Sequence, residues 1–333
     1  MAASLNCDVL VIGGGPAGTS AAITCARAGH FVILLEARMF PRHRPGETLH
    51  PGVEPLVQRL GAAAGLESAN FLRHAGVWVD RSGERDFQAY GSDESGPWLG
   101  YQATRSEFDA LLLEQARACG VRILQPHRAL CVLRAGVRIA GAETTAGAVH
   151  AICTIDASGS SAWLARQLAL PYRKASRKLI AYYGYVQGEC AAREAAPCFT
   201  FLPDGWIWTA RVRPNVFHWT RLSTTSPQLN PAPPAEFSGM ERLGRSKGAD
   251  VTWRILESSA GPGYFVAGDA ATVSDPSSSH GVLRALMSGM LAGHMVLRKT
   301  FRDEAEPVLS AEYRDFLRSS FEFDRARASS MLS

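Results

Sequence analysis

The sequence predicts an α/β fold in which a Rossmann-like dinucleotide-binding domain carries an inserted antiparallel sheet. Near the N-terminus, a short apolar run is followed by a glycine cluster, a helix of small residues and a second apolar run, which is typical of a parallel sheet. Between Leu179 and Trp253 the chain changes to alternating aromatic runs separated by turn residues, which favours antiparallel strands. Another apolar strand and a long helix follow Gly263. The first domain therefore resumes late in the chain.

The elements of this fold can be placed in chain order. The first unit comprises a strand at 9–12, a helix at 19–28 and a strand at 31–35. A helix at 53–60 precedes a hairpin with strands at 77–79 and 86–90. Helical spacing predicts a helix at 106–119, before a strand at 121–124. Glycine-punctuated alternation over 130–155 predicts a β-meander that returns to the parallel sheet at 153–156, and 281–297 is expected to be a long helix.

The composition fits a protein with a sizeable core. The 333 residues are 46% hydrophobic and 20% charged, enough for one large domain or two closely joined ones. The net charge of +4 is spread without a basic cluster, so no nucleic-acid partner is expected. The seven cysteines form no Cys-x-x-Cys pair and the N-terminus lacks a signal-peptide pattern, which favours a reducing, cytoplasmic location without a zinc ribbon. Arg284 and His294 interrupt the apolar stretch 281–297, so no transmembrane segment is expected.

A dinucleotide site is predicted at the first strand-to-helix turn. The fingerprint consists of Gly13, Gly15, Pro16, Ala17 and Gly18. Its glycines permit a tight turn and close approach of the backbone to a pyrophosphate, which the helix N-terminus attracts. Glu36, followed by Ala37, ends the next strand eighteen residues after Gly18, where a carboxylate can accept hydrogen bonds from a ribose diol. The same carboxylate disfavours a ribose phosphate, and the fingerprint alone leaves FAD and NAD open.

Three motifs in order resemble those of the flavoprotein hydroxylase superfamily. They are the glycine fingerprint, the segment Asp156-Ala-Ser-Gly159, and Gly268-Asp269, which precedes Pro276 and a helix beginning at Gly281 and Val282. The resemblance implies FAD, a Rossmann-like FAD-binding domain of the hydroxylase type, and a ribityl contact at Asp269. It also places Gly281 and Val282 beneath the flavin and Arg105 near the phosphates. The domains would comprise 1–75, 101–170 and 257–300 for FAD, 76–100 and 171–256 for substrate, and a C-terminal helical segment at 301–333.

Two segments narrow the resemblance to one branch of that superfamily. Arg44-Pro-Gly-Glu-Thr-Leu-His50-Pro51 and Pro203-Asp-Gly-Trp206-Ile-Trp208 are similar to segments of flavin-dependent halogenases and geranylgeranyl reductases. Halogenases of this family need a lysine in the first third of the chain, and here the first lysine is Lys174. The segment 275–289 is most similar to flavoproteins that mature tryptophylquinone cofactors by oxygenating a tryptophan of a partner enzyme. Aromatic hydroxylation is therefore expected, with a geranylgeranyl reductase-like activity as the alternative.

The residues expected to carry the chemistry are His280, His50, Trp206 and Trp208. His280, before the flavin helix, could donate a proton or hydrogen bond, or could simply cap that helix. His50 and Arg44 lie in a loop expected near the flavin, where Arg44 would contact the cofactor. Trp206 and Trp208 could either line the reaction site or pack within the sheet.

Electrons are expected from NAD(P)H or from a flavin reduced by a separate reductase. The substrate is a small aromatic molecule or a partner protein, such as the precursor of a quinone-cofactor enzyme. The short substrate sheet predicts a solvent-reachable groove lined by Trp206 and Trp208, with His280 at its base.

Overall fold

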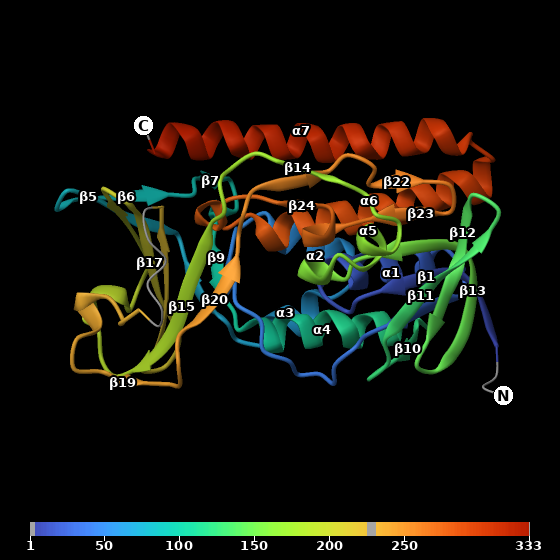
Figure 1. The fold of residues 1–333 in the computed structure, drawn as a ribbon. Coiled ribbons are helices and arrows are strands. Elements are labelled where there is room, and N and C mark those ends of the chain that lie inside the picture. The colour runs from blue at the N-terminus through green and yellow to red at the C-terminus, as the bar shows by residue number, and fades with distance from the viewer. Residues whose placement is uncertain (1–3, 225–230, 333) are drawn as a thin grey trace.

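The computed structural model describes residues 4–224 and 231–332 and shows two large sheets, with one long helix spanning both (Figure 1). The first sheet is mainly parallel and the second is mainly antiparallel. This confirms the predicted fold class.

The parallel part of the first sheet brings five strand ends to one edge. Its strands are ordered β10 (Arg122–Leu124), β2 (Val32–Leu35), β1 (Leu5–Ile12), β13 (Gly147–Asp156) and β23 (Tyr264–Val266). Ile12 pairs with both Leu35 and Asp156, and Asp156 pairs with Val266. The residues that follow these strands therefore emerge side by side, although more than 250 positions separate them in sequence. On the far side, β12 (Arg138–Thr144) and β11 (Ala129–Ala135) complete the predicted meander.

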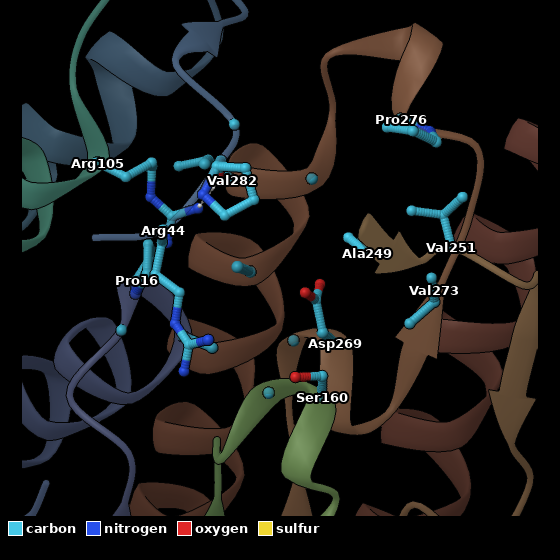
Figure 2. A pocket seen from close by; sticks show the side chains of 18 of the residues that line it. Pro16, Arg44, Arg105, Ser160, Ala249, Val251, Asp269, Val273, Pro276 and Val282 are labelled. Atoms are coloured by element: carbon cyan, nitrogen blue, oxygen red, sulfur yellow. Dashed lines mark hydrogen bonds between the residues drawn. The ribbon is translucent and has the colours of Figure 1, made fainter. Parts of the chain in front are cut away.

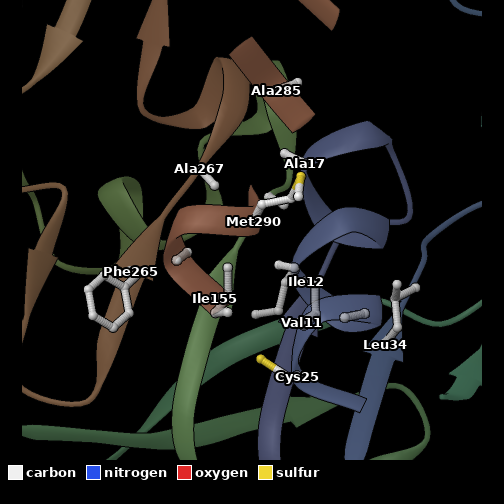
Figure 3. Packing of buried hydrophobic residues seen from close by; sticks show 14 of the residues in the cluster. Val11, Ile12, Ala17, Cys25, Leu34, Ile155, Phe265, Ala267, Ala285 and Met290 are labelled. Atoms are coloured by element: carbon white, nitrogen blue, oxygen red, sulfur yellow. The ribbon is translucent and has the colours of Figure 1, made fainter. Parts of the chain in front are cut away.

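Two helices pack against each other over this sheet. Helix α1 (Pro16–Arg27) contacts α6 (Gly281–Arg302), and Figure 3 shows Met290 of α6 beside Ala17 and above Ile12. Ser20 Oγ donates a hydrogen bond to the Leu286 carbonyl oxygen over 3.2 Å. Helix α4 (Arg105–Ala118) also packs on α1. Two shorter helices, α2 (Val53–Arg59) and α3 (Ala63–Ser68), lie between β3 (Thr48–Leu49) and β4 (Leu72–His74) in the chain.

The second sheet is built from the aromatic segments. Its central order is β15 (Ile180–Gln187), β18 (Val216–Ser223), β17 (Gly205–Arg213) and β16 (Cys198–Leu202). The predicted hairpin, β5 (Gly76–Arg81) and β6 (Glu84–Ala89), joins this sheet through parallel pairing of β5 with β16. On the other side, β20 (Lys247–Asp250) pairs with β15.

Helix α7 (Glu306–Leu332) packs into two hydrophobic cores, the first around the parallel sheet and the second on the antiparallel sheet. It runs along the top of the molecule in Figure 1, from the parallel sheet towards β5 and β6. Tyr313 is fully buried in the first core and donates a hydrogen bond to the Val266 carbonyl oxygen over 2.9 Å. Phe321, two turns later, packs into the second core with Trp206 and Trp208. Among the described residues, the helices are too short or too polar to cross a membrane.

Several element boundaries differ from those predicted. Helix α1 starts at Pro16 rather than at residue 19, because proline is compatible with the first helical position. Helix α6 continues to Arg302, five residues beyond the predicted end. Its additional turn is polar, so the apolar periodicity gave no signal for it.

Candidate cofactor and substrate site

A cavity of about 890 Å³ lies where the carboxyl edge of the parallel sheet meets one face of the antiparallel sheet. Its volume is near the upper end of the range for small-molecule and cofactor sites, about 300–1,000 Å³. Figure 2 shows Arg44 and Arg105 on the side next to Pro16, with Asp269 and Ser160 at another wall. The residues that line it come from segments far apart in the sequence, between Ile12 and Asp324.

The glycine fingerprint forms one end of this cavity. Gly13 has φ +108°, and a Cβ atom there would lie 2.3 Å from the Ala157 carbonyl oxygen. A Cβ atom on Gly18 would lie 1.8 Å from the Gly13 carbonyl oxygen. Only glycine allows the strand, turn and helix to approach so closely. Gly15 caps α1 without a side-chain hydrogen bond, so amides of the first turn can receive an anion from the cavity.

Glu36 and three arginines stand beside this loop. Glu36 Oε2 accepts a hydrogen bond from the Gly14 amide over 2.8 Å, and Oε1 accepts one from the Arg38 backbone amide over 2.9 Å. Arg105 pairs with buried Asp109 through Nε–Oδ1 and Nη2–Oδ2 distances of 2.7 and 3.0 Å. Arg42 lies between Glu36 and Asp109, and its Nη2 is next to Gly15. The buried Nε and Nη1 atoms of Arg42 have no hydrogen-bond partner within the described ranges.

The opposite wall comes from the late motifs. Asp269 follows β23 and is open to the cavity, while burial raises the pKa of its carboxyl group despite the nearby guanidinium groups of Arg105, Arg254 and Arg44. The loop 272–279 and the first residues of α6, Gly281 and Val282, continue this wall. Gly268 donates its amide hydrogen to Ser288 Oγ over 3.0 Å, which ties the Asp269 turn to α6.

Asp156 is positioned differently from the other predicted cofactor residues. It is fully buried and is not part of the cavity lining. Its Oδ1 accepts a hydrogen bond from the Ser158 amide over 2.9 Å, and Oδ2 accepts one from Leu164 over 2.7 Å. The carboxylate thereby fixes the turn that presents Ser158, Gly159 and Ser160 to the cavity.

The substrate-sheet wall is a single face of β15, β18 and β17. In the strand register, Thr220 pairs with Tyr183 on one side and with Trp208 on the other. Trp206 belongs to the same face, because residues two apart on a strand point to the same side. All four residues line the cavity, and Trp206 and Trp208 are only 2% and 8% exposed. Trp208 Nε1 donates a hydrogen bond to Thr48 Oγ1 over 3.1 Å.

A buried polar network adjoins this wall. Glu47, 2% exposed, accepts hydrogen bonds from the Tyr185 hydroxyl group and from the Gly46 amide, the latter over 2.8 Å. Its Oε2 lies 3.5 Å from His218 Nδ1, and His218 Nε2 lies 3.4 Å from Thr220 Oγ1. Burial lowers the pKa of His218, although the charge of Glu47 acts in the opposite direction.

His50 and His280 lie together, outside the set of residues that line the cavity. Their ring centroids are 4.9 Å apart. His280 Nδ1 lies 3.5 Å from Asp324 Oδ1 of α7, and Asp324 forms an ion pair with Arg284. Burial, followed by the charge of Arg284, lowers the pKa of His280 to about 4. Arg284 and Asp324 do line the cavity. His280 therefore lies directly behind these two lining residues.

Most residues predicted for the site are brought together by the fold. The cavity lining contains all the expected cofactor residues except Gly18 and Asp156: Gly13, Gly15, Pro16, Ala17, Glu36, Ala37, Arg44, Arg105, Gly159, Gly268, Asp269, Pro276, Gly281 and Val282. It also contains Trp206 and Trp208, but not His50 or His280. The sequence did not single out Arg42, Tyr183, His218 or Thr220, and Glu47 was noted only as part of the segment 44–51. The sequence features that could have identified these residues are the arginine-rich loop and the alternation of side-chain directions along β15 and β18.

The donors of the cavity suit a dinucleotide with a pyrophosphate group. Within the described part of the chain, eight arginines and six acidic residues line the cavity. Arg42, Arg44 and Arg105 lie near one another beside the N-terminus of α1. Guanidinium groups with unused N–H donors and helix amides are the groups that bind phosphate oxygens. The residues present therefore fit FAD.

Comparison with known proteins shows to which family this chain belongs. The profile of the family "FAD dependent oxidoreductase" matches residues 8–178. A tryptophan 2-halogenase of Chondromyces crocatus is 30% identical over 321 residues, which cover 86% of this chain and 60% of the halogenase. The chain thus spans about three fifths of the length of that relative. A menaquinone reductase of Mycolicibacterium smegmatis is 26% identical over 351 residues, covering 92% of this chain and 80% of the reductase.

The fold is also shared with solved structures. The myxobacterial chondrochloren halogenase CndH superposes with a TM-score of 0.85 at 23% sequence identity, covering 97% of this chain and 82% of that one. At this level of identity the similarity establishes a common fold.

Proposed function

Because this chain belongs to the FAD dependent oxidoreductase family, we propose that it holds FAD in the cavity and hydroxylates an electron-rich aromatic ring. FAD would supply the redox chemistry and the activation of oxygen. The overall reaction inserts one atom of dioxygen into an aromatic C–H bond and releases the other as water. The protein's own residues bind, orient and enclose the reactants.

The cofactor would lie between the two sheets. The amides at Gly15 to Ala17 and the guanidinium groups of Arg42, Arg44 and Arg105 would bind its phosphates. Glu36 would accept hydrogen bonds from the ribose of the adenosine, and Asp269 would do so from the ribityl chain. Gly281 and Val282 would lie against the flavin ring.

The observation that carries the proposal is the aromatic wall opposite this cofactor site. Trp206, Trp208 and Tyr183 line the same cavity as the glycine fingerprint and the start of α6. Aromatic side chains favour stacked or edge-to-face contacts with another ring. A buried, mostly apolar wall also excludes water from the reaction. An aromatic substrate would therefore be held against the same space that the flavin edge would face.

The lysine content favours hydroxylation over halogenation. The four lysines are Lys174, Lys178, Lys247 and Lys299, and the lining residues that the structure describes include no lysine. The halogenases that this chain resembles use a lysine to capture hypohalous acid. A ring held against Trp208 would instead receive an oxygen atom.

The electron donor and the substrate's origin belong to the same proposal. NAD(P)H, or a flavin reduced by a partner reductase, would supply two electrons per turnover. The ring could belong to a small molecule or to a tryptophan of a partner protein undergoing conversion to a quinone cofactor. The burial of Trp206 and Trp208 favours a small aromatic molecule.

A second candidate is reduction of an alkene or quinone without oxygen. It is favoured by the similarity to a menaquinone reductase over 92% of this chain. In that reaction the cavity would hold an isoprenoid or a quinone, and electrons would pass from the flavin to the substrate.

Purified, FAD-loaded protein can distinguish these reactions. It would be supplied with a flavin reductase, NADH and either indole or phenol, in the presence of labelled dioxygen and of bromide. We expect a product that contains one labelled oxygen atom, detected by mass spectrometry. A brominated product would contradict hydroxylation, and anaerobic reduction of a menaquinone would establish the second candidate. Failure to bind FAD would overturn both.

A further inference from the structure

A single polar side chain interrupts the aromatic row of the substrate sheet. Tyr183, Thr220 and Trp208 lie directly opposite one another on three adjacent strands. Neighbouring strands are about 4.8 Å apart, so the backbone positions of Tyr183 and Trp208 are separated by about 10 Å with Thr220 midway. A planar ring held against this row would have its edge over the Thr220 hydroxyl group.

The network behind Thr220 determines the direction of its hydrogen bond. Glu47 Oε2 lies 3.5 Å from His218 Nδ1, so a neutral His218 carries its proton on Nδ1, facing the carboxylate. Nε2 is then an acceptor and lies 3.4 Å from Thr220 Oγ1. With this tautomer the Thr220 hydroxyl group would donate its hydrogen to His218 Nε2. Its oxygen lone pairs consequently remain available on the cavity side.

Two neighbouring polar groups have partners of their own, one on this wall and one behind it. Trp208 Nε1 donates to Thr48 Oγ1, which in turn donates to Gln102 Oε1 over 2.9 Å. The Tyr185 hydroxyl group donates to Glu47. Trp208 therefore contributes ring surface to the cavity, and Tyr185 helps to fix Glu47.

We propose that Thr220 is a specificity-determining residue whose oxygen accepts a hydrogen bond from a ring N–H or O–H of the substrate. His218 and Glu47 act as positioning residues that hold the Thr220 hydroxyl group in this orientation. The proposal rests on the proposed function, because it concerns the aromatic substrate of that site. It predicts selection of rings that carry a donor over otherwise similar rings that carry a methyl group there.

The test uses equilibrium binding to the FAD-loaded protein, measured by calorimetry, and needs no turnover. The matched probes are indole with N-methylindole, pyrrole with N-methylpyrrole, and phenol with anisole. For at least one pair, we expect the donor-bearing ring to bind about tenfold more tightly, the ratio that corresponds to one buried hydrogen bond of about 1.4 kcal/mol. Thr220→Val should reduce that ratio to about one, and Thr220→Ser should restore it.

Two further variants separate positioning from general damage. Glu47→Gln should lower the binding ratio, because the side-chain amide can present an N–H group to His218 and alter its tautomer. Thr200→Val is the matched control, since Thr200 lies on β16, two strands away from β18, and points to the other face of the sheet. It should leave the ratio unchanged. A merely structural defect would weaken both members of a pair alike.

The outcomes distinguish this inference from the proposed function. Equal affinity within every pair, absence of binding, or an unchanged ratio in Thr220→Val would overturn the role of Thr220. Oxygen-dependent hydroxylation could still be observed in each of these cases. Conversely, a Thr220-dependent ratio in a protein that hydroxylates none of the donor-bearing probes would support the recognition site and contradict hydroxylation of those rings.

Discussion

At the scale of single residues, two carboxylates that follow apolar strands serve different purposes near the cavity. Asp156 uses both oxygens to accept backbone amides at 2.9 and 2.7 Å. Asp269 instead opens onto the cavity and faces several arginines. The sequence presents both as an aspartate after an apolar strand. Their roles differ because the chain after Asp156 turns back over the carboxylate and provides its own donors.

Replacement of Asp156 tests this structural assignment. Asp156→Ala removes the acceptor of two backbone amides, that of Leu164 buried and that of Ser158 partly buried, and an unsatisfied buried amide costs about 1–3 kcal/mol. We expect the free energy of unfolding, measured with urea on the flavin-free protein, to fall by about 2–5 kcal/mol. Asp93→Ala is the comparison, because Asp93 is exposed although it also accepts a backbone amide. A loss no larger than that of Asp93→Ala would show that the turn does not depend on Asp156.

At the scale of elements, the crossing of α1 and α6 brings two helix N-termini to one cavity. A Cβ atom on Gly289 would lie 2.1 Å from the Ala17 carbonyl oxygen and 2.3 Å from Ser20 Oγ. At Gly293, the nearest contact would be the Thr24 side chain at 2.9 Å. Glycine at these positions allows the helices to approach so closely that Gly15 and Gly281 line the same space.

Alanine substitutions should reveal this close approach. An exposed helix gains about 1 kcal/mol from a glycine-to-alanine change, but overpacking in a core costs about 1–3 kcal/mol. Gly289→Ala should therefore destabilise the protein and weaken FAD binding, as followed by flavin fluorescence. Gly293→Ala should have a smaller effect, because a side chain can shift more easily than a backbone carbonyl group. Equal effects, or stabilisation by Gly289→Ala, would be inconsistent with this packing.

The sequence was most informative where periodicity and glycine motifs coincide. The strand, helix and strand of the first unit, the hairpin at β5 and β6, and the meander of β11 to β13 all occur in the structure. The sequence could not show that Thr220 lies between Tyr183 and Trp208, because that depends on the pairing register of three strands. Nor could it place Asp324 beside His280, since the docking of α7 depends on tertiary contacts.

At the scale of the whole molecule, α7 joins the two sheets over the cavity. Tyr313 and Phe321 belong to different hydrophobic cores. Asp324, further along the helix and 4% exposed, pairs with Arg284 at the cavity wall. Burial lowers the pKa of Arg284 to about 10. Helix α7 and this ion pair therefore help to hold the two sheets in place relative to each other.

Removing the carboxylate of Asp324 should loosen this connection. Asp324→Ala leaves the guanidinium group of Arg284, 17% exposed, without its carboxylate partner, and breaking a buried pair in this way costs at most about 3–5 kcal/mol. We expect a loss of that size in urea unfolding, together with faster amide hydrogen exchange in α7. Asp315→Ala is the matched control on the same helix, because Asp315 is 70% exposed and pairs weakly with Arg318 at 3.6 Å. Similar behaviour of the two variants would argue against a structural role for the buried pair.

The same region should make the stability of the molecule sensitive to acid. Burial lowers the pKa values of His50 and His280 to about 4, whereas an unfolded histidine titrates near 6.5. Between these values the unfolded chain binds more protons than the folded protein, so the free energy of unfolding falls as the pH decreases from about 6.5 to about 4. For His280 alone, this linkage corresponds to a loss of about 2 kcal/mol between pH 7 and pH 5.

His280→Asn should lose about 2 kcal/mol less than the unmodified protein over that interval, as measured by urea unfolding at both pH values. His294→Asn, at an exposed position of the same helix, should retain the full dependence. If His280→Asn also retained it, the imidazole of His280 would not be held neutral by the contacts between α6, α7 and the His50 loop.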